Sequence, residues 1–333
     1  MQKNIAKQKI SLMIVPTGTG ASIGGYASAY AQKIAGHIPL IVNPNIVNAA
    51  VFSGITANMY YVEGYFIEQF VKGEIGLLPS KDNKIGVIFD RAISKNVLNI
   101  HINTINAMKT VYGIDITGYE ITDETAGVEF FTTDSGISSG CVKNPTTLKK
   151  TGQKLIKKGA QTIAVVCKFA EPPQDEYEKG NGVDIVGGVE AIISHYLSKE
   201  LMCPCVHAPA FEDVTIDGNI VDEKVSAEYI TPTFLPCLLT GLRNAPLIVK
   251  KENITPECIT YKNLHSVCVP YNALGSSVVL DCIEKDIPVY AILENKTVLN
   301  IDKTSINKTI AIKEIATYDD YINIIKEIEY EKS

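Results

Sequence analysis

The chain has 333 residues, of which 46% are hydrophobic, and its formal net charge is −6. This length and composition allow a large buried core in one or two domains. The acidic balance and the dispersed Lys and Arg residues argue against a nucleic-acid partner.

Signals for membrane insertion and export are weak. No apolar run in the sequence reaches the roughly 20 residues of a membrane-spanning helix. The N-terminal stretch MQKNIAKQKI is basic but lacks the apolar region and cleavage site of a signal peptide. The eight cysteines lie mostly in apolar segments, as reduced core thiols do. We therefore expect a cytoplasmic protein with no membrane partner.

The hydrophobic pattern predicts strands and helices that alternate along the chain. This alternation indicates an α/β fold with repeated βαβ units and mostly parallel, Rossmann-like sheets. The predicted strands cover residues 10–16, 39–43, 84–90, 116–122, 161–169, 266–270 and 288–295. The predicted helices cover residues 26–35, 97–112, 144–160, 187–201, 278–286 and 318–333. In three units a strand ends in a Gly/Ser loop that leads to a helix, and these loops read TGTGASIGG, TTDSGISSGC and NALGSS.

A polar segment rich in Pro and Gly interrupts the alternation at residues 171–184. Such a composition is typical of a linker or a lid. It divides the chain into an N-terminal α/β half, residues 1–170, and a C-terminal α/β half, residues 185–333. A homo-oligomer is an option on general grounds, because soluble oligomers are mostly symmetric assemblies of one chain.

The first Gly/Ser loop is the clearest candidate for a binding site. Glycines let a backbone approach a ligand closely, and a helix N-terminus attracts anions through its free N–H groups. We expect a small anionic ligand, a carboxylate or a phosphorylated metabolite, on this loop. Its candidate contacts are Thr17, Gly18, Gly20, Ser22, Gly24 and Gly25.

The same loop does not fit a nucleotide fingerprint. No Gly-Lys-Ser/Thr follows it, so it is not a Walker sequence. Its third glycine comes one residue late for the pattern G-x-G-x-x-G, and the returning strand ends in IVNPN without an acid for a ribose. Binding of NAD is therefore not expected, and the cofactor is open.

An Asn-rich segment follows the second predicted strand. Asn45 lies in it as a further ligand-binding candidate, and Glu63 lies among apolar and aromatic residues. A carboxyl group in such surroundings can have a raised pKa and act as an acid or a base. The alternative is an Asn-rich turn with a surface glutamate.

The stretch from Gly187 to Pro209 holds the other candidates for chemistry. A helix would carry Glu190 and His195. Cys203, Cys205 and His207 would follow it in a loop punctuated by prolines. A thiol beside an imidazole can form an activated nucleophile, with Cys237 as the second candidate thiol. The sequence C-x-C-x-H also resembles half a metal site. We expect no metal, but if one is present its ligands are Cys205, His207 and Cys237.

Two later loops could face the same crevice. In an open parallel sheet, ligands bind at the carboxyl ends of the strands. The candidates there are Ser135 and Ser138 in one loop, Gly275 and Ser276 in the next, and Glu294 and Asn295 at the end of the last predicted strand. Ordinary loop polarity is an equally good interpretation of each. A serine-based amidohydrolase that uses these serines with Lys168 and Lys296 ranks last, because the first unit has Asn45 where a lysine would stand.

Several motifs together resemble an uncharacterised domain-of-unknown-function family of bacteria and plant plastids. They are PTGTGASIGGYA, YVEGY, GVD..GGVEAIISH, HAPA, TFLPCLLTGL and ENKT, and they cover nearly the whole chain. The resemblance implies a cytosolic or stromal enzyme but supplies no reaction. Cys205, His207 and Cys237 match the family pattern, whereas Cys141 and Cys203 look peculiar to this chain.

The leading hypothesis is a metabolic enzyme of the isomerase, lyase or hydrolase type. It would act on a small anionic metabolite by acid–base or thiol-assisted chemistry through Glu63, His195, His207 and a thiol. One alternative is a metal-dependent or iron–sulfur lyase. The other is a ligand-binding regulatory protein without chemistry.

Overall fold

Two parallel sheets form the centre of the protein. The computed structural model describes residues 8–172, 176–216, 218–307 and 311–330. The first sheet has the strand order β16-β15-β14-β1-β2-β5, with every neighbouring pair parallel. Its strands are β1 (Ile10–Met13), β2 (Leu40–Val42), β5 (Met59–Tyr61), β14 (Leu264–Pro270), β15 (Val289–Ile292) and β16 (Ile312–Ile315).

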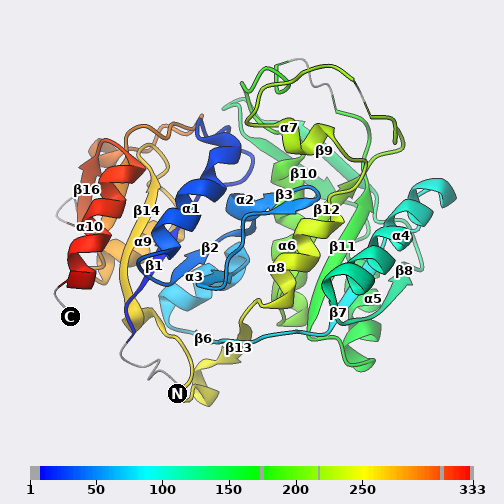
Figure 1. Ribbon diagram of the computed structural model, residues 1–333, viewed down its shortest axis with the longest axis horizontal. Helices are drawn as coiled ribbons and strands as arrows, with labels where there is room; N and C mark the ends of the chain where they lie inside the picture. Colours follow the sequence, from blue (N-terminus) through cyan, green and yellow to red (C-terminus); the bar gives the residue numbers. More distant parts are fainter. Residues whose placement is uncertain (1–7, 173–175, 217, 308–310, 331–333) are drawn as a thin grey trace.

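The second sheet lies beside the first, on the right in Figure 1. It has the order β12-β11-β7-β8 and is also parallel throughout. Its strands are β7 (Ile85–Phe89), β8 (Ile116–Ile121), β11 (Thr162–Lys168) and β12 (Cys205–Ala210). The central strands are buried on both faces, which explains why they read as continuous apolar runs.

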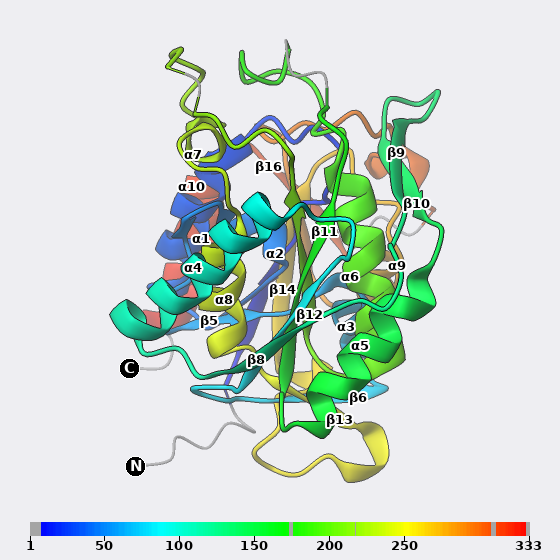
Figure 2. The same ribbon diagram turned by 90° about the vertical axis from the view of Figure 1, so that its right-hand side faces the viewer.

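Helices cover both faces of each sheet, so that each forms a three-layer unit (Figures 1 and 2). On the first sheet, α1 (Ala27–Ala35) and α10 (Tyr318–Tyr330) pack on one face, and α3 (Gly64–Lys72) and α9 (Ser277–Glu284) on the other. On the second sheet, α4 (Lys95–Tyr112) and α8 (Leu235–Arg243) lie opposite α5 (Pro145–Lys157) and α6 (Gly187–Leu201). One hydrophobic core runs from α1 and α10 through α8 to the second sheet, which joins the two units.

Short elements complete the fold. The helices α2 (Pro44–Val47) and α7 (Ser226–Tyr229) are single turns. Antiparallel pairs are formed by β3 (Asn48–Ala49) with β4 (Phe52–Ser53), β6 (Ile75–Leu78) with β13 (Leu247–Lys250), and β9 (Val128–Thr132) with β10 (Ser138–Val142).

The predicted α/β class with mostly parallel sheets is confirmed. Each sheet draws strands from both predicted halves of the chain. The first sheet combines β1, β2 and β5 with β14, β15 and β16, and the second adds β12 to β7, β8 and β11. The sheets therefore do not separate at residues 171–184, of which 173–175 lie outside the described residues. The last three residues of the predicted helix 318–333 also lie outside them.

Two local predictions were wrong. Cys205 and His207 were expected in a loop, but they belong to strand β12, because the parallel partner β11 completes their backbone hydrogen bonds. The loop TTDSGISSGC was expected to lead directly from a strand to a helix. It instead contains the turn and second strand of the hairpin β9–β10, where Ser138 pairs with Thr132.

Candidate functional site

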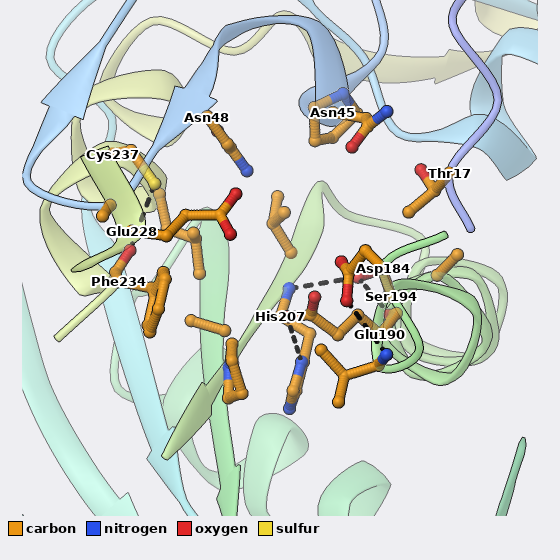
Figure 3. A pocket seen from close by; sticks show the side chains of 18 of the residues that line it. Thr17, Asn45, Asn48, Asp184, Glu190, Ser194, His207, Glu228, Phe234 and Cys237 are labelled. Atoms are coloured by element: carbon orange, nitrogen blue, oxygen red, sulfur yellow. Dashed lines mark hydrogen bonds and ion pairs between the residues drawn. The ribbon is translucent and has the colours of Figure 1, made fainter. Parts of the chain in front are cut away.

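A cavity of about 860 Å³ lies between the two parallel sheets. Its lining includes the residues that follow β1 and β2, the end of β12, one side of α6 and the start of α8. This is the crevice at the carboxyl ends of parallel strands where α/β proteins bind ligands. Figure 3 shows Glu190 and Ser194 of α6 across the cavity from Glu228 and Cys237, with Asn45 and Asn48 along a third side.

The first turn of α6 is fixed by an unusually close backbone contact. A Cβ on Gly188 would lie 2.1 Å from the carbonyl oxygen of Ser138, so only glycine fits there. The Ser138 hydroxyl accepts a hydrogen bond from the Gly188 N–H (2.9 Å) and donates one to the Ile185 carbonyl (2.6 Å). The helix therefore sits on β10 in one position, and its residues Glu190, Ser194 and His195 face the cavity at helical spacing.

His207 and Glu190 form the best-defined polar pair of the cavity. His207 Nε2 accepts a hydrogen bond from the backbone N–H of Cys167 (3.2 Å), so Nδ1 carries the ring proton and donates to Glu190 Oε1 (3.2 Å). The His207 side chain is fully buried and stacks on Phe169. Burial lowers the pKa of His207 to about 3, so the imidazole is neutral. The Ser194 hydroxyl on α6 accepts a hydrogen bond from the backbone N–H of His207 (3.0 Å), which ties β12 to α6.

Three carboxyl groups meet in this part of the cavity. Burial, followed by the charges of Asp184 and Glu228, raises the pKa of Glu190 well above its usual range. Burial and the charge of Asp184 raise the pKa of Glu228 to about 8, and the Tyr177 hydroxyl donates to its Oε1 (3.2 Å). Burial also raises the pKa of Asp184, whose carboxylate accepts from the Val186 N–H. At neutral pH the cluster therefore holds protons on carboxyl oxygens.

A second carboxyl–imidazole pair borders the same cavity. Glu63 is 5% exposed, caps α3 by accepting from the Tyr65 N–H (2.8 Å), and lies 3.8 Å from His195 Nδ1. Burial raises the pKa of Glu63 to about 8, in line with the sequence expectation for a carboxyl among aromatic residues. Burial lowers the pKa of His195, which is half-exposed and packs edge-on against Tyr65.

The two candidate thiols differ in position. Cys237 borders the cavity at the start of α8, and burial raises its pKa to about 12 while its thiol donates to the Phe234 carbonyl (3.1 Å). Cys205 is buried away from the cavity lining, 3.8 Å from the Cys203 sulfur, and burial raises its pKa as well. Both groups are therefore thiols rather than thiolates at neutral pH.

The glycine loop packs mainly against the protein itself. A Cβ on Gly18 (φ +70°) would meet Ser138, and one on Gly20 (φ +59°) would lie 2.8 Å from the Gly182 carbonyl oxygen. The Ser22 N–H donates to the Lys296 carbonyl (2.7 Å), and the Gly25 N–H donates to the Lys224 carbonyl (3.2 Å). Gly24 is close to Lys224. Within the loop, only Thr17 borders the cavity.

The remaining predicted residues are spread over the molecule. Asn45 and Ser276 border the cavity, and Ser276 caps α9 by accepting from the Val279 N–H. Ser135 is exposed at the hairpin turn, and Gly275 packs on Ile301. Asn295 is buried and links the Ile23 N–H to the Tyr318 hydroxyl, and Glu294 accepts from the Tyr318 N–H. These last two residues hold the glycine loop and α10 in place.

Several residues of the cavity were not among the predicted site residues. Glu190 was expected on the same helix as His195 but was given no role. Five positions turn an α-helix by about 140° beyond a full turn, so their spacing did not indicate a shared face. Asp184 was assigned to the linker. Glu228 comes from the single-turn helix α7 and Tyr177 from a turn, and neither carries a motif that would have brought them together.

The described residues contain neither a metal-ligand cluster nor a membrane-spanning helix. Within this part of the chain, no group of three or more His, Cys, Asp and Glu side chains is arranged to hold a metal ion. No helix in the same residues is both long and apolar enough to cross a bilayer.

Comparison with known proteins places the chain in a family. It is 34% identical over 305 residues to an uncharacterized lipoprotein of the cyanobacterium Synechococcus sp.. The matched region covers 89% of this chain and 85% of the relative. The sequence pattern of one family matches residues 10–329. The chain therefore belongs to the family described as protein of unknown function (DUF3326).

Proposed function

We propose that the protein is an enzyme that performs acid–base chemistry on a small polar metabolite in the cavity between the sheets. The observation that carries this proposal is the buried Glu190–His207 pair, in which a neutral imidazole donates to a carboxyl group with a raised pKa. A carboxylic acid that keeps its proton near neutral pH is suited to general acid catalysis and, once ionised, to general base catalysis.

The two partners have different roles in this proposal. His207 is a positioning residue, because its Nε2 is occupied by the Cys167 N–H and its Nδ1 by Glu190. It fixes one carboxyl oxygen of Glu190 and leaves the other to carry the proton that is exchanged with the substrate. Glu228 and Glu63, whose pKa values are raised to about 8, are available as second acid–base groups for an isomerase, lyase or hydrolase reaction.

The other chemical hypotheses have less support. The raised pKa of Cys237, about 12, argues against a thiolate nucleophile. An anion on the glycine loop would compete with the protein groups that already occupy the Ser22 and Gly25 N–H donors. The cytoplasmic location and the homo-oligomer stay predictions from the sequence.

The proposal is tested by turnover. The wild-type protein and its Glu190→Gln variant are incubated with a pool of small polar metabolites, and the change in each compound is followed by mass spectrometry. We expect the wild type to convert at least one compound and the variant to do so at least ~100-fold more slowly, because Gln cannot transfer the proton. Glu252→Gln, an exposed change outside the cavity, is the matched control. Equal rates in all three proteins, or binding without conversion, would contradict the proposal.

A further inference from the structure

The charge of the cavity lining points to the class of ligand. We infer that the cavity takes a substrate with a positively charged amino group, which its carboxyl groups would hold. This inference rests on the proposed function, since it concerns the same cavity.

The charged side chains around the cavity are nearly all of one sign. Among the described residues that line it there is no lysine and no arginine. Its lining contains acidic residues from both sheet units and from the segments that follow β11 and β12, namely Glu63, Glu68, Glu171, Glu178, Asp184, Glu190, Asp213 and Glu228. The pKa values of His195 and His207 are lowered, so the titratable groups of the lining add only negative charge when they ionise. The walls therefore favour a cation over an anion.

The interior also has the other groups that an amine needs. Phe211, Phe234 and Tyr229 border the cavity, and aromatic faces attract ammonium groups. The Tyr229 hydroxyl is buried and, within the described part of the chain, has no hydrogen-bond partner. A ligand donor would satisfy this oxygen, because a buried hydroxyl without a partner is unfavourable.

The mutual repulsion of the carboxyl groups makes binding of a cation depend on pH. An ammonium group stabilises the ionised carboxylates, so its binding releases a proton from a group such as Glu228. The pKa of Glu228 is influenced by the charge of Asp184 and by the Tyr177 hydroxyl, and the charge of Glu228 in turn raises the pKa of Tyr229. The charges of Asp184 and Glu228 raise the pKa of Glu190, and His207 donates a hydrogen bond to it. The charge of Glu190 in turn raises the pKa values of Cys167, Cys237 and Tyr61. Both sets consist of acids and neutral groups, so no fixed cation of the protein replaces the ligand.

The test compares three probes of equal carbon length by isothermal titration calorimetry. They are putrescine, which carries two ammonium groups, the neutral diol, and succinate. We expect putrescine to bind the wild-type protein more tightly than either other probe. Its Kd should fall by up to ~tenfold for each unit of pH as the pH rises toward the pKa of Glu228, because binding displaces one proton. Glu228→Gln should weaken binding roughly tenfold and flatten this pH dependence, and Glu252→Gln should change neither.

The outcomes separate this inference from the proposed function. Absence of putrescine binding at every pH, or tighter binding of succinate or the diol, would overturn the amine inference. The proposed function would then still stand on the turnover difference between the wild type and Glu190→Gln. Equal turnover in that pair would overturn the proposed function, whichever probe binds.

Discussion

His207 has its two ring nitrogens occupied by protein groups, which makes its protonation costly. A proton could be added only at Nε2, where it would break the hydrogen bond from the Cys167 N–H. The ring has no exposed surface from which water could compensate. The conformation of this one residue therefore fixes the tautomer and the neutral state of the imidazole, and it orients Glu190.

This arrangement predicts a specific dependence of stability on pH. The pKa of His207 is about 3 in the folded protein against a usual value of 6.5, so the unfolded chain binds one more proton between these values. The free energy of unfolding should therefore fall by up to ~1.4 kcal/mol for each pH unit as the pH drops through this range. Urea denaturation across the acid range should show a shallower fall in His207→Gln than in the wild type. His37→Gln is the control, and an identical slope in all three proteins would rule out a buried neutral His207.

At the scale of elements, α6 matters most because it supplies Glu190, Ser194 and His195. Its position depends on the contact between Gly188 and the Ser138 backbone. Gly188→Ala must push α6 away from β10, and we expect a loss of about 1–3 kcal/mol in stability together with weaker ligand binding. Gly64→Ala is the matched control, since a Cβ there has no neighbour within 4 Å. Denaturation of both variants gives the comparison, and equal stability would refute the contact.

The elements also show what the sequence could predict. Apolar runs with Gly and Pro at their ends were sufficient for β1, β2, β7, β11, β14 and β15. The helical pattern was sufficient for α1, α4, α5, α6, α9 and α10, whereas α3 and α8 were not predicted. The glycine loop was correctly placed before α1, but its role was not predictable. Whether four glycines approach a ligand or another chain segment depends on distant residues such as Ser138, Gly182 and Lys224. The strand β12 was mistaken for a loop because proline is uncommon inside strands. Its pairing with β11 joins segments that are distant in the sequence, so no local pattern indicates it.

At the scale of the whole molecule, both ends of the chain complete one sheet. Adjacent strands β1 and β14 are more than 250 residues apart in sequence, and no local pattern reveals that pairing. The candidate site depends on the same long-range assembly, because Glu190, Glu228 and Glu63 come from three separate segments. The sequence named Glu63 and His207 as single candidates, and both border the cavity, whereas the acidic cavity as a whole could not be predicted.

The shared core predicts cooperative unfolding of the two sheet units. Leu239 of α8 is fully buried in the cluster that joins them. Leu239→Ala should lower the free energy of unfolding by about 2–5 kcal/mol and still give one transition, because both units lose the same packing. Far- and near-ultraviolet circular dichroism should follow coincident curves in both proteins. Two separated transitions in the wild type would contradict a common core.

The proposal that Glu190 is the general acid of the cavity is tested most directly by measuring its protonation state. Infrared difference spectra of the wild type and Glu190→Gln at neutral pH report whether this carboxyl group carries a proton. We expect a carbonyl band of a protonated carboxylic acid in the wild type that is missing in the variant, since burial and the neighbouring acids raise the pKa of Glu190. A carboxylate band lost in its place would contradict the account, because an ionised Glu190 could not serve as the general acid of the cavity.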